Sequence, residues 1–374
     1  GATGDGGDRT VGHLRPVGRV VGIREVRVAI VGAGALGTTY AVLLARAGAD
    51  VTVVARPARV AELAGGLAVR GLVEASARVP VVSTGAELGD VDYLILATKV
   101  GDADSAVASL AGATVGTAIS LQNGLAKNDA LDRMFGPERV LGAACAVVAG
   151  RGDRPGEAVL TMNRATWLGE RRPIRAGISS ETRTVATNET GMGRTERAAR
   201  LAAVFRAAGL PSWSVPDGHA VEWYKLCALL PGSLVTALAR CSYGEMALHP
   251  LLSRQFVAIM RETFRVPVSL GLFGAPGADP VDPPGAPWSF GTWLAGSDDV
   301  ALAGLRAIGE AQASAGQRVL PSMVQDVFAG RVTEVEALVG GLLARARDAG
   351  LLLPSTETCY RLLRGLEDTA QDRH

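Results

Sequence analysis

The chain has few of the residues from which metal sites and disulfide frameworks are built. It contains four cysteines in 374 residues, Cys145, Cys227, Cys241 and Cys359, and no C-x-x-C pair. Its four histidines form no H-E-x-x-H motif or other spacing typical of zinc ligands. The sequence therefore predicts no metal and no disulfide scaffold, and the expected compartment is the cytoplasm, where thiols stay reduced.

An excess of one charge and a long apolar run are also missing. The formal net charge is +1, which gives no basic surface for nucleic acid. The longest apolar stretch, residues 223–239, contains Lys225, Pro231 and Gly232. It falls short of the roughly 20 apolar residues that a bilayer requires. We expect a small-molecule substrate as the partner, with no nucleic acid and no membrane, and a homodimer is compatible with the apolar composition.

What the chain has is apolar residues in an alternating pattern. Hydrophobic residues make up 48% of the sequence, enough for a large core, and the length suggests about two domains. Strand-like runs at 26–34, 50–56, 93–99, 117–122 and 140–150 alternate with helical segments. This order predicts an α/β Rossmann domain with a doubly wound, mostly parallel sheet.

Beyond residue 216 helical periodicity replaces the alternation. We therefore divide the chain into a flexible, glycine-rich leader (1–25), a Rossmann domain (26–215) and a mostly α-helical C-terminal domain (216–374). A polar stretch at 174–194 is expected to be exposed. A Pro/Gly-rich stretch at 274–288 is expected to form a loop.

The first strand runs directly into G-A-G-A-L-G, which then opens a helix. This is the position of the dinucleotide-binding glycine motif. Gly32 permits the tight turn, Gly34 lets the backbone approach a pyrophosphate, and Gly37 allows the helix to pack against the strand. The first helical residues, Ala35 and Leu36, offer unpaired N–H groups to the phosphates. The alternative is a tight turn without a ligand.

The second strand ends at Arg56, where an NAD enzyme usually carries Asp or Glu for the ribose hydroxyls. A guanidinium at this position suits the 2′-phosphate of NADP(H), because it can pair with phosphate oxygens in a bidentate manner. The sequence thus favours NADP(H) as the cofactor. The alternative is a solvated arginine at the strand end.

Two further polar positions follow predicted strands. Lys99 closes the third strand, and Asn123 lies in a Gln-Asn-Gly segment after the fourth. Ligands bind at the carboxyl ends of the strands in doubly wound sheets, so both are candidates for the nicotinamide and substrate region. The alternatives are a solvated charge for Lys99 and simple turn chemistry for Asn123.

Lys225 is the only charged residue in the segment WYKLCALLPGSLVTALA. Burial of an ammonium group in an apolar helix lowers its pKa, which can make lysine a general acid near neutral pH. The alternative is a lysine whose ammonium reaches solvent from the helix edge. The Pro231-Gly232 pair is expected to interrupt this helix.

The segment PSMVQDVFAGRVTEVEALVGG carries two helix-start signatures. Ser322 with Gln325, and Thr333 with Glu336, fit the capping box. Glu334 would then be an acid in the first turn, where the helix dipole favours it. On this interpretation alone these residues only cap helices.

Taken together, these segments resemble the ketopantoate reductase (2-dehydropantoate 2-reductase) family. The matches are IVGAGALG with Arg56, ATK at Lys99, QNG at Asn123, EWYKL at Lys225, and SMVQD…GRVTE from Ser322 to Glu334. They run in order through the chain from residue 26 to about 367. The resemblance implies a Rossmann domain followed by a helical domain, with NADPH and a 2-oxo acid meeting between them.

The resemblance also implies roles for single residues. Lys225 would be the general acid that protonates the carbonyl oxygen, and Glu334 would orient the substrate hydroxyl and the lysine. Ser322 would contact the substrate carboxylate. The complete set of implied substrate contacts is Asn123, Ser322, Ser233, Lys99 and Asp326. Lys99, Asn123 and Glu334 would also adjoin the cofactor.

The chain departs from the family pattern on the catalytic helix. The family places asparagines four and eight positions after the lysine, where this chain has Leu229 and Ser233. The family's later Asn-Gly is Val339-Gly340 here. The substrate is therefore either 2-dehydropantoate or another carbonyl or imine, because loss of amide donors changes which polar groups a pocket selects. Two alternatives stay open: a non-catalytic NADP(H) sensor, and a hydroxyacid or opine dehydrogenase that shares only the Rossmann half.

Overall fold

The computed structural model describes residues 23–171, 194–273 and 280–371. The leader up to residue 22, nearly all of the stretch 174–194 and the first part of the loop 274–288 lie outside these ranges. Among the described helices, none is long and apolar enough to cross a membrane.

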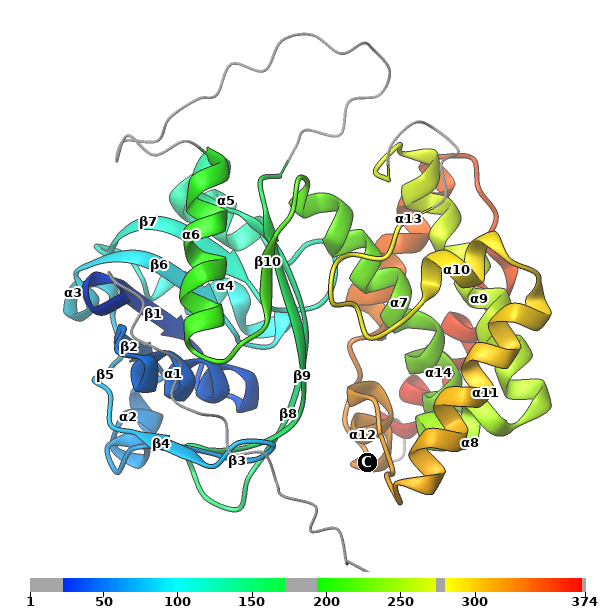
Figure 1. Ribbon diagram of the computed structural model, residues 1–374, viewed down its shortest axis with the longest axis horizontal. Helices are drawn as coiled ribbons and strands as arrows, with labels where there is room; N and C mark the ends of the chain where they lie inside the picture. The colour runs from blue at the N-terminus through cyan, green and yellow to red at the C-terminus, as the bar shows by residue number, and fades with distance from the viewer. Residues whose placement is uncertain (1–22, 172–193, 274–279, 372–374) are drawn as a thin grey trace, which may run out of the picture.

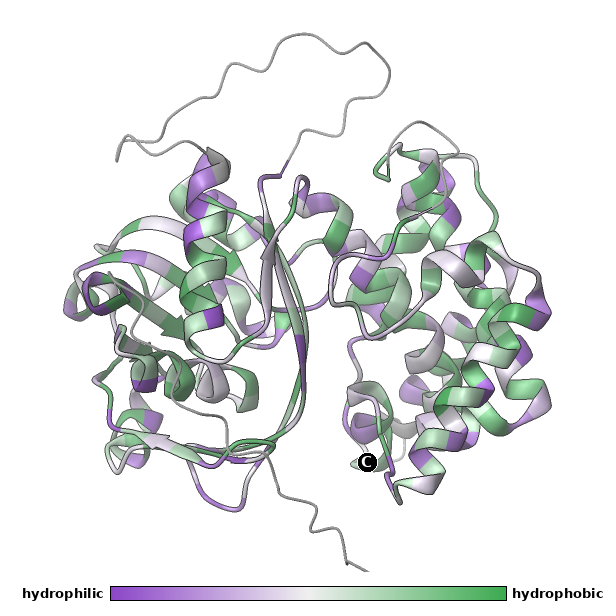
Figure 2. Cartoon of the chain, in the orientation of Figure 1, coloured by the Kyte–Doolittle hydropathy of each residue, from purple (hydrophilic) through white to green (hydrophobic). Residues whose placement is uncertain are grey.

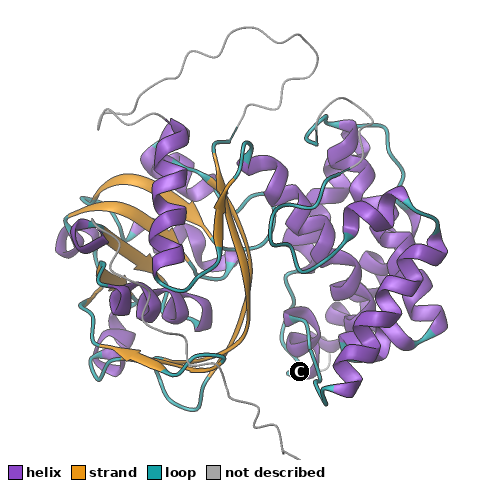
Figure 3. Cartoon of the chain, viewed as in Figure 1, coloured by secondary structure: helices purple, strands orange, loops and turns teal. Residues whose placement is uncertain are grey.

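Strands gather in one part of the molecule and helices alone form the other, with α7 beginning at the junction (Figures 1 and 3). The first part holds a parallel sheet of five strands in the order β5-β2-β1-β6-β7. Its strands are β1 (Arg27–Val31), β2 (Asp50–Val54), β5 (Val81–Val82), β6 (Asp90–Leu96) and β7 (Thr114–Ser120). The connecting helices are α1 (Ala35–Ala47), α2 (Pro57–Leu63), α3 (Gly85–Leu88) and α4 (Ala103–Ala108), and α5 (Asp129–Phe135) follows β7. The predicted Rossmann-type architecture is confirmed.

The predicted fifth strand of this sheet belongs to a second sheet. β8 (Gly142–Arg151) pairs antiparallel with β9 (Glu157–Gly169), which also pairs with β3 (Leu67–Gly71) and β10 (Ser212–Ser214). β4 (Ala75–Ala77) lies beyond β3. The expectation of a parallel strand at 140–150 was wrong because β8 and β9 are joined by a short hairpin. A parallel pair needs a crossover of about a dozen residues or more.

The fold includes residues 23–25, which the sequence analysis assigned to the leader. Ile23–Glu25 form a single 3-10 turn, η1, and Ile23 is only 5% exposed. Ile23 packs with Val26 in the core of the sheet part, so residues 23–25 belong to the fold and not to the leader. Apolar side chains at these two positions account for the difference.

The larger core of the sheet part is formed by the parallel sheet, helices α1 and α6 (Arg194–Ala207) and strands of the second sheet, and a smaller one by the parallel sheet with α4 and α5. Tyr40 of α1 and Phe205 of α6 meet edge to face at 5.3 Å between ring centroids. Beneath them Arg197 of α6, 2% exposed, binds the carboxylate of Glu170 through two hydrogen bonds of 2.9 and 2.7 Å. Apolar positions line the inner faces, and hydrophilic ones the outer faces (Figure 2).

The helical part is built around α7 (Gly218–Ala239), which is buried along most of its length. Around it lie α8 (Tyr243–Leu248), α9 (Pro250–Ser269), α10 (Phe290–Ala295), α11 (Asp298–Ser314), α12 (Ser322–Phe328), the π-helical turn η4 (Glu336–Gly340), α13 (Gly341–Asp348) and α14 (Pro354–Gln371). Contrary to expectation, α7 continues through Pro231 and Gly232. Pro231 has no N–H group, so the helix lacks one backbone hydrogen bond there. Pro231 and Gly232 are both buried, and the ring of Tyr243 packs directly against Gly232. This packing holds the helix together.

Candidate active site

The glycine motif forms the turn that it predicts. Gly32 has φ +103°, a conformation that favours glycine, and an added Cβ would lie 2.8 Å from the Thr98 side chain. A Cβ on Gly37 would lie 1.9 Å from the carbonyl oxygen of Gly32, so this position requires glycine for helix–strand packing. Gly34 differs, because its Cβ would meet only one atom, at 3.9 Å.

The space beside Gly34 suits a dinucleotide. Gly34 is the N-cap of α1, and the first turn of this 13-residue helix carries no acidic side chain. The N–H groups at such an end, here of Ala35, Leu36 and Gly37, lack partners within the helix and attract anions. Absence of a side chain at Gly34 leaves these donors accessible to a pyrophosphate, so the residues present fit the cofactor.

Arg56 lies at the carboxyl end of β2, as the sequence indicates. It is exposed and directly precedes α2. The neighbouring Arg59 is paired with Glu62 at 2.7 Å. In Rossmann folds the adenosine ribose lies beside the end of the second strand, so a contact between Arg56 and a ribose phosphate stays a prediction.

The ends of β6 and β7 bring Lys99 and Asn123 to the same edge of the sheet. The side-chain amide of Gln122 donates to the carbonyl oxygens of Thr98 and Lys99, at 3.0 and 2.9 Å, and thereby joins the two strand ends. Asn123 itself is half-buried. Gly124 has φ +95°, and its Cβ would lie 3.2 Å from Leu338 of η4. The Gln-Asn-Gly turn thus contacts the helical part.

A pocket lies on the helical side of this contact. Its lining residues come from α7, α12, η4 and the segment that precedes η4: Ser233, Ser322, Met323, Asp326, Glu334 and Leu338. Four of these six are residues that the sequence singled out. Val339, at the family's asparagine position, is fully buried in the apolar core, and its neighbour Leu338 lines the pocket.

Charges from both parts of the molecule converge at this pocket. Asp326 is buried and lies 3.5 Å from the ammonium of Lys99 and 2.7 Å from the guanidinium of Arg331. The carboxylate of Glu334 accepts a hydrogen bond from the backbone N–H of Val100. Burial raises the pKa of Glu334 above its usual value, and the charge of Lys99 opposes this rise.

The two predicted capping boxes do not form. Ser322 is the first residue of α12, the residue before it is Pro321, and the amide of Gln325 donates to the carbonyl oxygen of Leu320. The backbone N–H of Thr333 donates to Glu367 of α14, whereas Glu336 accepts from the hydroxyl of Tyr360. At the second signature the Thr333 hydroxyl still accepts from the backbone N–H of Val335 at 3.1 Å, but partners on α14 take the place of the reciprocal bond between Thr333 and Glu336.

Lys225 lies on α7 on the same helical face as Leu229 and Ser233, four and eight residues further on. Its ammonium lies 4.9 Å from the ring centroid of Trp288, within the range of a cation–π interaction. Burial lowers the pKa of Lys225 below the ordinary 10.5; the nearby thiol of Cys145 opposes this shift and the charge of Lys127 adds to it. Lys225 is half-buried, and its role as the proton donor stays a prediction.

The two predicted catalytic groups have different neighbours. Glu334 interacts with Lys99 and Val100, whereas Lys225 adjoins Trp288, Cys145 and Lys127. The implied role of Glu334 in orienting Lys225 stays a prediction.

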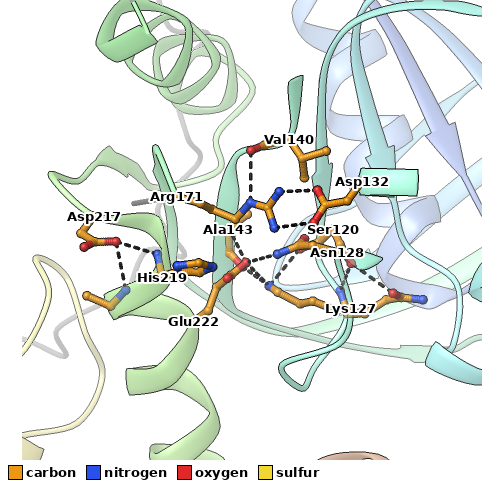
Figure 4. A network of polar contacts seen from close by, with 12 residues as sticks. Ser120, Lys127, Asn128, Asp132, Val140, Ala143, Arg171, Asp217, His219 and Glu222 are labelled. Carbon is orange, nitrogen blue, oxygen red and sulfur yellow. Dashed lines mark hydrogen bonds and ion pairs between the residues drawn. The ribbon is translucent and has the colours of Figure 1, made fainter. Parts of the chain in front are cut away.

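The sequence analysis missed three residues at the site: Arg331, Trp288 and Lys127. One signal could have found Lys127. Of the 38 basic residues only three are lysines, Lys99, Lys127 and Lys225, and the other 35 are arginines. All three lysines lie where the sheet part meets the helical part, and Figure 4 shows Lys127 within a network of buried polar contacts.

Within the described residues, no cluster of three or more His, Cys, Asp or Glu side chains could hold a metal ion. The features that converge are a glycine turn typical of dinucleotide binding, two strand ends that carry Lys99 and Asn123, and a helical domain with a pocket and the half-buried Lys225. They define a two-domain oxidoreductase that uses a nicotinamide cofactor.

Comparison with known proteins gives the family. The pattern described as "Ketopantoate reductase PanE/ApbA" matches residues 28–173, and "Ketopantoate reductase PanE/ApbA C terminal" matches residues 219–367. The chain therefore belongs to the ketopantoate reductase family.

Individual relatives agree with this assignment over nearly their full lengths. The chain is 27% identical over 345 residues to a 2-dehydropantoate 2-reductase from Archaeoglobus fulgidus, which covers 92% of this chain and 99% of that protein. A solved 2-dehydropantoate 2-reductase from Geobacter metallireducens is 27% identical, with a TM-score of 0.70 over 91% of this chain and 100% of the other. D-mandelate dehydrogenase, solved with NADH and anilino(oxo)acetate, shares the fold at 18% identity, with a TM-score of 0.68 over 92% of this chain and 100% of the other.

Proposed function

We propose that this protein reduces the carbonyl group of a 2-oxo acid with NADPH, and that Lys225 supplies the proton. The observation that carries the proposal is the position of Lys225: a half-buried residue of α7, with the pKa of its ammonium lowered by burial, on the helical face that continues to the pocket residue Ser233.

The chemistry divides between cofactor and protein. Bound NADPH supplies a hydride, which becomes the new C–H bond at the carbonyl carbon. Lys225 donates the proton that converts the developing alkoxide into a hydroxyl, and the lysine is left as a neutral amine. Lys99 and Ser322 hold the carboxylate of the substrate, and Asn123 and Glu334 orient the reacting carbonyl between the two parts of the molecule.

The proposed preference for NADP(H) depends on Arg56. Substitution Arg56→Ala removes the guanidinium that would pair with the 2′-phosphate, a charge-assisted interaction worth about 1.5–3 kcal/mol. We expect the dissociation constant of NADPH to rise by about 10- to 100-fold, as measured by quenching of tryptophan fluorescence. The dissociation constant of NADH is the internal control and should hardly change. Equal weakening of both cofactors would place Arg56 outside the phosphate site.

The substrate is either 2-dehydropantoate or a carbonyl or imine compound with a less polar side chain, because Leu229 occupies a family asparagine position. The test is NADPH oxidation with 2-dehydropantoate beside a panel of 2-oxo acids, ketones and cyclic imines. Selective turnover of 2-dehydropantoate would assign the enzyme to pantothenate synthesis. Turnover of another compound would identify a diverged reductase. NADPH binding without any turnover would favour the sensor alternative and overturn the proposal.

Substitution of Leu229 and Ser233 by the asparagines of the family pattern tests which substrate the enzyme uses. The double variant Leu229→Asn/Ser233→Asn places two amides on the face of α7 that carries the pocket residue Ser233, and each hydrogen bond to substrate is worth about 0.5–1.5 kcal/mol. We expect kcat/KM for 2-dehydropantoate to rise roughly 10-fold, while kcat/KM for an apolar 2-oxo acid falls. The matched control is Leu238→Asn, one residue before the end of the same helix. A similar rise of kcat/KM for 2-dehydropantoate in Leu238→Asn would show that the effect does not depend on positions 229 and 233.

Three further proposals follow from the sequence. We place the domain boundary near residue 216, where β10 gives way to α7, and the protein in the cytoplasm, in keeping with its four free cysteines. We also propose a homodimer: Leu362 and Leu366 are 56% and 52% exposed on α14. The dimeric ketopantoate reductase from Staphylococcus aureus has this fold, at 17% identity and a TM-score of 0.64 over 92% of this chain and 100% of the other.

A further inference from the structure

Two buried charges join the Asn123 turn to the helix that carries Lys225. Lys127 lies four residues after Asn123, and Glu222 lies three residues before Lys225. Their side chains are 3% and 5% exposed, and the ammonium of Lys127 lies 3.2 Å from Oε1 of Glu222. The pair spans the sheet part and the helical part (Figure 4).

Each charge has several partners. The ammonium of Lys127 also donates to the carbonyl oxygens of Ser120, at 3.1 Å, and of Ala143. Oε1 of Glu222 accepts from the amide of Asn128 at 2.8 Å and from the backbone N–H of Ala143 at 3.1 Å. The end of β7, the start of β8 and the first turns of α7 therefore meet at one ion pair.

We propose that Lys127, held by Glu222, is a positioning residue of the active site: it fixes the first turns of α7 against the Asn123 turn and keeps a second ammonium beside Lys225. This inference rests on the proposed role of Lys225 as proton donor. Lys127 itself is not placed against the substrate or the cofactor.

Stability alone is a poor explanation for this pair. Buried ion pairs lose much solvation energy, and well-packed apolar residues in their place are often as stable or more so. Lysine is also scarce in this chain, with three residues against 35 arginines. An ammonium is a compact charge, and a nearby cation makes a second lysine a better proton donor.

The electrostatic effect has a definite sign. The positive charge of Lys127 disfavours the protonated form of Lys225 and so lowers the pKa of Lys225, in the same direction as burial. The other groups that face Lys225 are the thiol of Cys145 on β8, which opposes the shift, and the ring of Trp288, whose π-face favours the cation. Glu222, bound to Lys127, is the counter-charge in this group.

The scarcity of lysine permits a direct test. Protein labelled with ¹³C at lysine Cε gives only three side-chain signals, which Lys99→Ala, Lys127→Met and Lys225→Met assign. We expect the Lys225 signal of the full-length protein to titrate below the ordinary lysine range, and its midpoint to move to higher pH in Lys127→Met. In Glu222→Gln, which keeps the cation and removes its counter-charge, the midpoint should stay where it is or fall.

A kinetic measurement accompanies the titration. Because a general acid must be protonated, turnover falls as pH rises through its pKa, so the alkaline limb of kcat should move upward in Lys127→Met and not in Glu222→Gln. If either single variant fails to fold, the neutral double variant Lys127→Met/Glu222→Gln replaces it, and its midpoint should also lie above that of the wild type.

The inference fails if the Lys225 midpoint is the same in folded Lys127→Met, the double variant and the wild type. Failure of the proposed function looks different: Lys225→Ala would then retain turnover, although the midpoint of Lys225 in the wild-type protein still responds to Lys127.

Discussion

Substitution Lys225→Ala is expected to lower turnover by about 10²- to 10⁴-fold, the range that a positioned general acid contributes. The structure gives the reason: Lys225 is the only charged residue of α7 between Glu222 and the end of the helix, and burial lowers its pKa. The measurement is kcat from NADPH oxidation with the best substrate of the panel. NADPH affinity should change little, because the glycine turn lies on the sheet part.

A matched variant separates proton donation from simple charge. Lys225→Arg keeps a cation, but a guanidinium does not release its proton in proteins. We expect this variant to be nearly as inactive as Lys225→Ala. Recovery of most of the turnover with arginine would contradict the general-acid role and leave electrostatic stabilisation of the alkoxide as the function of Lys225.

Substitution Arg197→Ala is expected to reduce the free energy of unfolding by about 3–5 kcal/mol, because it leaves the carboxylate of Glu170 partly buried without its counter-charge. The two hydrogen bonds from Arg197 tie α6 to the end of β9, and the arginine is 2% exposed. Denaturant titration followed by tryptophan fluorescence measures the loss, since Trp167 is buried on β9.

The control for Arg197→Ala is an exposed ion pair with the same N–O distance, 2.7 Å. Arg361 and Glu357 lie 2.7 Å apart on α14, with side chains 74% and 37% exposed. Exposed pairs contribute about 0–1 kcal/mol, so Arg361→Ala should lower stability only slightly. Similar losses in the two variants would mean that burial does not set the strength of the Arg197 pair.

The glycine turn, the strand ends and the helical second domain could be predicted because each signal is local. Gly32, Gly34 and Gly37 follow one strand and open one helix, and their spacing alone reports the backbone that they form. Lys99 and Asn123 were found because parallel strands bring their carboxyl ends to the same edge.

The features that could not be predicted from the sequence depend on partners that are distant in the chain. Lys127 binds Glu222, 95 positions away, and no spacing rule connects them. Thr333 fits a capping box with Glu336, yet its N–H donates to Glu367, 34 residues further on. The strand at 142–151 has the composition of a parallel strand, but it pairs antiparallel with β9 because a short hairpin joins the two. Tertiary packing decided each of these cases.

The placement of the three lysines has a consequence for proteolysis. A lysine-specific protease can cut this chain only after positions 99, 127 and 225. The side chains at 127 and 225 are buried or half-buried in the folded protein, and the ammonium at 99 lies beside Asp326 of the helical part. Cleavage at Lys127 or Lys225 therefore requires local opening, and ligands that hold the two parts of the molecule together should slow it. Digestion by such an enzyme would report on opening between the sheet part and the helical part, whereas an arginine-specific protease would report on the surface as a whole.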